Sequence, residues 1–388
     1  MSEEGDLKTK PKLRPFRSSP ERSLYYGMDM LGKVYEIKRY DSSRDRSLRS
    51  YSAADEYLLQ DFDDLETKPS SIAIYHDRFG FLACHLRFYN PTIVLTHKSQ
   101  QKAIELNLAS NNLEPVPFSD PLSSFTDKID FALFKAPKSL ALFELFLQHI
   151  AQNSTEEVSV LIGFMTRHFS PKLLEIAQKY FGDVTQSRAV KKARVLELRK
   201  KKKFAEIDPV DLISYNDQVY KQYWGVFSAS HIDYATQYLL EHLDLKPDDH
   251  KILDLASGNG VIGKEILLKL PNAEIHLLDD FNLAVESAKL NIQSDHVHHH
   301  FNHDLSDFED ATFELIVTNP PFHFEYEVSI NIPLQLFAEC HRCLKPNGSL
   351  QLVANNHLNY AKHLKSIFST VELLAQNDKF TVHKCVKR

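Results

Sequence analysis

The chain has 388 residues, 43% of them hydrophobic, with a formal net charge of −6 and an isoelectric point near 6.3. This length favours two domains with separate cores, and the net acidity argues against a protein that binds nucleic acid over its whole surface. No apolar run reaches membrane-spanning length, and the four scattered cysteines do not form a disulfide framework, so we expect a soluble cytoplasmic protein.

The chain divides by composition into a tail and two blocks. Residues 1–30 are rich in Ser, Pro, Lys, Arg and Glu and predict a flexible basic tail, without the apolar stretch of a secretory signal. In the first block, 31–204, we expect strands over 71–77, 92–96 and 129–134 and a helix over 100–109. The seam to the second block, around 188–203, is rich in Lys and Arg, with Glu197 as its one acidic residue.

The second block, 205–388, alternates strand and helix patterns more clearly. Strands are expected over 251–256, 274–278, 313–318, 349–354 and 371–375, helices over 283–292, 333–344 and 358–368, and an edge strand over 379–387. This alternation predicts a mostly parallel sheet with helices on both faces. Open sheets of this kind bind ligands where their strands end, and Asp254, Asp279 and Asn319 fall at such ends.

A glycine-rich turn follows the first strand of this block. The chain has 11 glycines, and Gly258, Gly260 and Gly263 lie within six residues, after Asp254. Glycine suits a turn that needs positive φ or close approach of a ligand. A phosphate-binding Walker loop is excluded because no Gly-Lys-Ser/Thr follows, whereas a dinucleotide site remains possible in principle. Asp279 is placed to accept hydrogen bonds from ribose hydroxyls.

The stretch Asn319-Pro320-Pro321-Phe322 predicts a second, chemically specific site. Two prolines remove two backbone donors and hold the chain extended, which leaves carbonyls free to accept hydrogen bonds. An Asn side-chain oxygen beside a proline carbonyl forms a pair of acceptors suited to an exocyclic amine, and a Phe ring offers a face for stacking. The first block repeats this layout without the chemistry, since Lys-Ala-Pro-Lys (135–138) stands in its place.

Together these motifs resemble the class I S-adenosylmethionine-dependent methyltransferases. Asn-Pro-Pro-Phe-His (319–323), Cys-Leu-Lys-Pro-Asn-Gly (343–348) and Val-Ala-Asn-Asn-His-Leu (353–358) are similar to the ribosomal RNA guanine-N2 methyltransferases. Ala-Ala-Asp-Glu-Tyr-Leu-Leu (53–59), Lys-Ala-Pro-Lys-Ser-Leu-Ala-Leu (135–142) and Lys-Lys-Ala-Arg (191–194) resemble the large-subunit methyltransferase G family. The resemblance covers about residues 31–388.

The resemblance implies an α/β fold with two tandem Rossmann-like class I methyltransferase domains, a degenerate one over 31–204 and a catalytic one over 205–388. It implies S-adenosylmethionine as cofactor, no metal, and the N2 amine of a guanosine in 23S ribosomal RNA as substrate. The residues expected to bind the cofactor are Asp254, Gly258, Gly260, Asp279 and, through the adenine amine, Asp304. The residues expected to hold the guanine are Asn319, Pro320, Pro321 and Phe322.

A basic run in an RNA enzyme is a candidate for phosphate contact, although such runs are more often solvated. The residues expected to bind RNA are Lys191, Lys192, Arg194, Lys200, Lys201, Lys202 and Lys203. Two departures from the family stand out: Ala256-Ser257 replaces Gly-Cys, and Ala229 replaces an Arg. The alternatives are a 16S guanine-N2 enzyme, a DNA adenine-N6 or glutamine-N5 methyltransferase, and a catalytically silent RNA-binding assembly factor.

Two further clusters have metal-like spacing. His296, His298, His299, His300 and His303 lack a patterned Cys or carboxylate partner, so we expect a surface loop there. Cys340 and Cys343 lie inside a predicted helix without a second pair, so we expect them to be packing residues.

Overall fold

The computed structural model describes residues 12–13, 35–39, 49–320, 323–324, 327–328 and 331–388. The described chain forms two compact units. Of the described residues, unit 1 contains 12–13, 35–39, 49–95 and 100–207, and unit 2 contains 96–99, 208–320, 323–324, 327–328 and 331–388. The tail predicted over residues 1–30 lies outside the described residues except for Lys12–Leu13.

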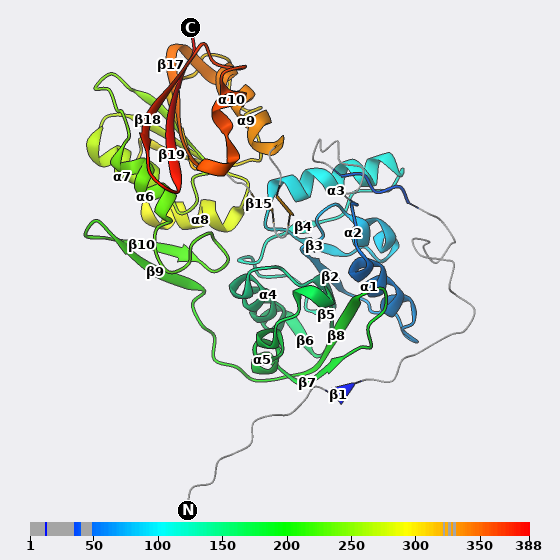
Figure 1. Cartoon of the computed structure of the whole chain (residues 1–388). Helices are drawn as coiled ribbons and strands as arrows, with labels where there is room; N and C mark the ends of the chain where they lie inside the picture. Colours follow the sequence, from blue (N-terminus) through cyan, green and yellow to red (C-terminus); the bar gives the residue numbers. More distant parts are fainter. Residues whose placement is uncertain (1–11, 14–34, 40–48, 321–322, 325–326, 329–330) are drawn as a thin grey trace, which may run out of the picture. The chain divides into compact units, whose positions relative to one another are not determined.

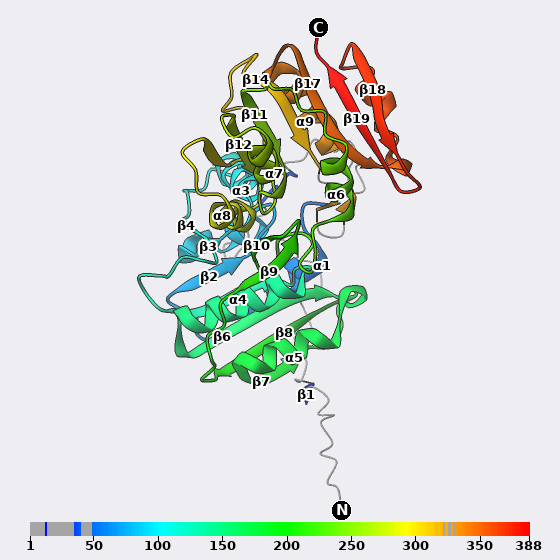
Figure 2. The same ribbon diagram turned by 90° about the vertical axis from the view of Figure 1, so that its left-hand side faces the viewer.

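Unit 1 is built around one eight-stranded sheet with the strand order β1-β7-β8-β6-β5-β2-β3-β4. Its strands are β1 (Lys12–Leu13), β2 (Ile72–Tyr75), β3 (Thr92–Val94), β4 (Phe118–Ser119), β5 (Ile129–Lys135), β6 (Ser154–Met165), β7 (Phe181–Gln186) and β8 (Ala193–Lys201). Its helices are α1 (Ala53–Asp63), α2 (Phe81–His85), α3 (Lys98–Ser110), α4 (Leu140–Asn153) and α5 (Pro171–Tyr180). Figure 1 shows α1 on one side of the sheet and α4 and α5 on the other, and Figure 2 shows α4 and α5 side by side over β6 and β8.

Unit 2 begins with a hairpin, β9 (Val210–Tyr215) and β10 (Gln218–Tyr223), followed by a seven-stranded sheet with the order β13-β12-β11-β14-β17-β19-β18. The strands of the sheet are β11 (Lys251–Leu255), β12 (Glu274–Asp279), β13 (Val297–Phe301), β14 (Phe313–Thr318), β17 (Leu344–Asn355), β18 (Thr370–Gln376) and β19 (Phe380–Val386). The helices are α6 (Tyr234–Glu241), α7 (Val261–Lys269), α8 (Asn282–Asn291), α9 (Asn331–Cys343) and α10 (Tyr360–Leu364). A two-stranded ribbon, β15 (His323–Phe324) and β16 (Glu327–Val328), precedes α9.

The sheet of unit 2 carries a hydrophobic core on each face because side chains alternate along its strands. Ile252 of β11 packs in the core formed with α6, α7 and α8, whereas its neighbour Leu253 packs in the core formed with α9 and α10. Figure 1 shows these two groups of helices on opposite sides of β17 and β19. Strands buried on both faces explain the near-continuous apolar runs in the sequence.

The two units have the same topology. When β2, β3, β4, β5, β6, β7 and β8 are matched in turn to β11, β12, β13, β14, β17, β18 and β19, the strand orders coincide. The equivalent strands β8 and β19 are each antiparallel to both of their neighbours. The predicted fold class of two tandem α/β domains is therefore confirmed.

Three local predictions are wrong. The segment 379–387 is not an edge strand, because β19 lies between β17 and β18 and its residues 382–385 are buried. The histidines at 298–300 do not lie in a surface loop but on β13, which pairs in parallel with β12. The basic run is not a seam, because residues 193–201 form β8, whose apolar side chains Val195, Leu196 and Leu198 are buried in unit 1.

The cysteines behave as packing residues. Cys340 and Cys343 are free thiols on α9, and both are fully buried in a core of unit 2, which confirms their predicted packing role. Among the described residues, no helix is long and apolar enough to cross a membrane.

Candidate active site

The loop after β11 has the geometry of a ligand-binding turn. Ala256 and Gly258 have φ of 59° and 56°, and Gly260 has φ of 82° where it caps α7. A Cβ at Gly258 would meet no atom within 4 Å, whereas one at Gly260 would come within 3.1 Å of Ala288. Gly258 therefore borders open space, and Gly260 lets the turn pack closely on α8.

Asp254 anchors this loop from the end of β11. Its side chain is fully buried, and its Oδ2 accepts a hydrogen bond from the amide of Gly263 at 2.9 Å. Burial, together with a smaller contribution from the nearby Asp279, raises the pKa of Asp254 to about 7. The carboxylate thus holds the first turn of α7 against the sheet.

Two buried polar atoms at this loop have no hydrogen-bond partner within the described part of the chain. They are Oδ1 of Asp254 and Oγ of Ser257. An orphaned buried acceptor is costly unless a ligand or water supplies a donor. The ammonium and hydroxyl groups of S-adenosylmethionine are donors of this kind, so the residues present fit that cofactor.

Asp279 ends the neighbouring strand β12 and faces the same loop. Its Oδ2 accepts from the amide of Gly258 at 2.8 Å, and its Oδ1 accepts from the amide of Phe281 at 2.9 Å. Burial raises the pKa of Asp279 to about 6, although the two amide donors act in the opposite direction. Each oxygen keeps acceptor capacity, which suits a pair of ribose hydroxyls.

Asn319 follows β14, the strand that pairs with β11 on its other side. Its Nδ2 donates to Asp233 Oδ2 at 3.0 Å and to Thr236 Oγ1 at 2.9 Å. Asp233 is also the N-cap of α6, where Oδ2 accepts from the amides of Ala235 and Thr236. With both amide hydrogens used, the side-chain oxygen Oδ1 is the atom left for a ligand, and no described residue donates to it.

Three residues that position this site went unnoticed in the sequence. Asp233 and Thr236 lie more than 80 residues before Asn319, although an Asp three residues before a Thr at a helix start is a recognisable capping pattern. Gln222 is the third. Its Nε2 donates to the carbonyls of residues 226, 227 and 228, and its Oε1 accepts from Asn259 in the glycine-rich loop.

Other predicted site residues are placed differently. Asp304 Oδ1 accepts from the amide and hydroxyl of Ser306, and its Oδ2 lies 3.2 Å from His303 Nε2, so it shapes its own turn. Its contact with adenine stays a prediction. Pro320 is buried. The predicted roles of Pro321 and Phe322 lie outside the described residues.

Several side chains of the basic run form ion pairs inside unit 1. Lys191 Nζ lies 3.2 Å from Glu56, Lys200 Nζ 2.9 Å from Asp183, and Lys201 Nζ 3.3 Å from Glu156. Lys192, Lys202 and Lys203 are exposed, and Arg194 is half-buried on β8. RNA binding by this run stays a prediction.

Unit 1 retains the loop geometry of the site but not its chemistry. His76 has φ of 56° and Gly80, which caps α2, has φ of 82°, as Ala256 and Gly260 do in unit 2. The carboxylate of Asp77 accepts from the amides of Gly80 and Ala83 and so fills the turn from within. The loop needs no ligand to satisfy this carboxylate.

Strand register identifies the replaced residues. Tyr75 pairs with Val94 and Phe134 in unit 1, as Leu255 pairs with Leu278 and Thr318 in unit 2. The residues that stand in place of Asp254, Asp279 and Asn319 are therefore Ile74, Leu95 and Lys135. Asp77 lies three residues beyond the position equivalent to Asp254, and Thr96 lies one residue beyond the position equivalent to Asp279.

Lys135 is also engaged. Its Nζ lies 3.1 Å from Asp55 Oδ2 on α1, so Lys135 forms an ion pair where Asn319 of unit 2 donates a hydrogen bond to Asp233.

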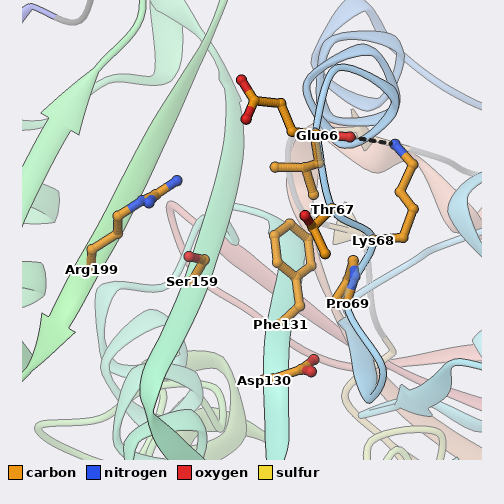
Figure 3. Close-up of a pocket in the computed structure, with 9 residues that line it drawn as sticks. Glu66, Thr67, Lys68, Pro69, Asp130, Phe131, Ser159 and Arg199 are labelled. Carbon is orange, nitrogen blue, oxygen red and sulfur yellow. Dashed lines mark hydrogen bonds between the residues drawn. The ribbon is translucent and has the colours of Figure 1, made fainter.

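A cavity of about 400 Å³ does exist in unit 1, lined by Leu65, Glu66, Thr67, Lys68, Pro69, Asp130, Phe131, Ser159 and Arg199 (Figure 3). It lies at the amino ends of β2 and β5, the opposite edge from the one where open α/β sheets bind ligands.

Two family models match the chain in succession. The RLMG N-terminal domain matches residues 27–202, and the methyltransferase small domain matches residues 218–384. The chain belongs to the RlmG family of methyltransferases. It is an S-adenosylmethionine-dependent enzyme with its methyltransferase domain in the second half.

The chain is also similar to solved structures. The T. thermophilus 16S rRNA N2 G1207 methyltransferase RsmC, in complex with AdoMet and guanosine, is 21% identical, with a TM-score of 0.72 over 88% of this chain and 93% of that chain. A putative methyltransferase complexed with the Haloferax volcanii Trm112 activator is 13% identical, with a TM-score of 0.32 over 40% of this chain and 89% of that chain. The first match covers both units of the RlmG-family chain and supports the tandem fold.

Proposed function

We propose that this enzyme transfers a methyl group from S-adenosylmethionine to the exocyclic N2 amine of a guanosine in 23S ribosomal RNA. The observation that carries this proposal is the orientation of Asn319, whose amide hydrogens are held by Asp233 and Thr236. The oxygen left over is an acceptor at the carboxyl end of β14, next to the strand that carries the glycine-rich loop. An acceptor in this place suits an amine substrate and not a carbonyl or phosphate.

Asn319 and Pro320 would activate the amine by hydrogen bonding. The lone pair of a guanine N2 is delocalised into the ring, and acceptors for its two hydrogens favour a more tetrahedral nitrogen. Asn319 Oδ1 is one acceptor, and the carbonyl of Pro320 is the expected second. Acceptors that are already in place when positive charge develops on nitrogen stabilise the transition state.

The cofactor, when bound, supplies a methyl group on a positively charged sulfur. Asp254 and Ser257 would hold its amino-acid part through their unpartnered buried atoms, and Asp279 would hold its ribose. Positioning of the two reactants in one crevice accounts for most of the rate, up to roughly 7–11 kcal/mol.

The choice of RNA rests on the family and on the fold. The family model that matches residues 27–202 is the RLMG N-terminal domain. RsmC, the structure with a TM-score of 0.72, is a 16S rRNA guanine-N2 methyltransferase. We place the enzyme in the cytoplasm, with naked rRNA or an assembling large subunit as partner. A 16S substrate is the alternative outcome of the same experiment.

The decisive experiment uses rRNA from a strain that lacks the enzyme, incubated with labelled S-adenosylmethionine and purified protein. We expect N2-methylguanosine in 23S rRNA with the wild type and a loss of turnover with Asn319→Ala, which retains cofactor affinity. Methyl incorporation into 16S rRNA alone would redirect the substrate assignment. Unchanged incorporation by Asn319→Ala, or an absence of cofactor binding, would overturn the mechanism.

A further inference from the structure

A histidine-rich face lies at the edge of the unit 2 sheet, away from the candidate active site. Glu274 and His276 are two residues apart on β12, so their side chains share one face of the sheet. His298 pairs with His276 across β12 and β13 and projects to the same face. One ligand atom from each of these three residues lies within 4.8 Å of the others.

The distances bring these atoms to a common point. Nε2 of His276 lies 2.8 Å from Glu274 Oε1, and Nε2 of His298 lies 3.5 Å from the same oxygen. Neighbouring ligands of a tetrahedral ion, with metal–ligand distances of about 2.0–2.1 Å, are separated by about 3.3 Å. Small side-chain rotations would therefore place all three atoms around one ion.

His276 is held rigidly in a ligand-ready position. Its side chain is 9% exposed, and its ring stacks on His300 and makes edge contacts with Phe308 and Phe313. The other ring nitrogen, Nδ1, lies 2.9 Å from His300 Nε2. Histidine ligands are usually oriented by an outer hydrogen bond on the nitrogen that does not bind the metal, and His300 is placed to provide it.

The charge of the cluster also suits a cation. The carboxylate of Glu274 lies beside the imidazoles of His276 and His298 and offers an anionic oxygen to an ion. Lys251 Nζ lies 3.2 Å from Glu274 Oε1 and provides positive charge there in the absence of an ion. The lysine side chain is partly exposed and can turn toward solvent when an ion binds.

We propose that Glu274, His276 and His298 form a binding site for one divalent first-row transition ion, Zn²⁺ in particular. The carboxylate and the two Nε2 atoms would supply three ligands, and water would supply the fourth. Because its ligands come from adjacent strands, the ion would fasten edge strand β13 to β12. Glu274 and Asp279 lie at opposite ends of β12, about 16 Å apart, so the ion has no part in methyl transfer.

The test uses the full chain and Co²⁺, whose visible absorption reports tetrahedral coordination, followed by competition with Zn²⁺. The ligand variants are His298→Ala and Glu274→Gln, both at partly exposed side chains. The matched control is His299→Ala, because His299 lies on the same strand but projects to the other face. His300→Ala tests the outer hydrogen bond.

We expect one Co²⁺ per chain, and affinity lowered by more than about 100-fold in His298→Ala and Glu274→Gln. The control should match the wild type, and His300→Ala should bind about 10–100-fold more weakly. Zn²⁺ should raise the unfolding temperature of the wild type and the control but not of His298→Ala. An absence of tetrahedral Co²⁺ absorption would overturn the proposal, as would equal loss of binding in His298→Ala and His299→Ala, which would indicate nonspecific binding by surface histidines.

Discussion

Replacing Thr236 by valine tests the orientation of the Asn319 amide directly. Valine has nearly the same shape as threonine but lacks the hydroxyl that accepts a hydrogen bond from Asn319 Nδ2 at 2.9 Å. The amide then keeps Asp233 alone as an orienting acceptor. A rotated amide would present its NH2 group to the target amine, and two donors facing each other do not bind.

The size of the effect follows from the strength of the lost hydrogen bond. A neutral hydrogen bond of this kind contributes about 0.5–1.5 kcal/mol, which corresponds to about a 2- to 13-fold lower rate constant for the chemical step. A hydrogen bond to a charged group contributes about 1.5–3 kcal/mol, so Asp233→Ala should cost more. Asp233→Ala also removes the N-cap of α6, which makes Thr236→Val the cleaner change.

The assay is single-turnover methylation of rRNA from a strain that lacks the enzyme, with cofactor affinity measured separately by calorimetry. Thr236→Val should lower the rate of methylation and leave the affinity for S-adenosylmethionine unchanged. Thr236→Ser keeps the hydroxyl and should restore the rate, which separates loss of the acceptor from loss of packing.

Two results would refute this reasoning. The first is a rate for Thr236→Val equal to that of the wild type while Asn319→Ala is inactive. The second is an equal loss of rate in Thr236→Val and Thr236→Ser. Either outcome would mean that the hydroxyl of Thr236 does not orient the amide.

The remaining predictions concern the cofactor site, unit 1 and the basic run. Asp279→Ala should weaken S-adenosylmethionine binding at least about tenfold in calorimetry, since its hydrogen bonds are charged; unchanged affinity would exclude a ribose contact. Because the pKa of Asp254 is raised from 3.8 to about 7 in the folded state, the cofactor-free protein should lose stability as pH rises through that window, and Asp254→Asn should lack this component in denaturant titrations. Lys135→Ala should lower stability by about 1–2 kcal/mol, because it removes the cation beside the buried carboxylate of Asp55 and leaves that group only its hydrogen bonds from Ser52, without changing cofactor binding. Lys202→Glu with Lys203→Glu should reduce the salt dependence of RNA binding by about 0.7–0.9 per lost phosphate contact, and an unaltered slope would argue against contact.

Much of the fold could be predicted from the sequence because strands buried on both faces are continuously apolar and helices between them are not. The predicted strand at 313–318 matches β14 in both bounds. The prediction failed where charge hid the pattern, as in β8, whose buried residues are interleaved with Lys and Arg. It failed again at β19, because alternation along one strand does not reveal whether neighbours cover both of its edges.

The chemistry of the site divides in the same way. By itself, the sequence determined that Asp254, the glycines, Asp279 and Asn319 would gather at one sheet edge, since each of these groups directly follows or ends a strand and parallel strands end together. Only the tertiary structure decided which atom of Asn319 is offered to a ligand. That choice depends on Asp233 and Thr236, which come from a distant helix and hold the NH2 group in place. The tertiary structure also brought Glu274 beside the histidines of β13. Cross-strand neighbours depend on strand register, and local sequence patterns carry little information about register.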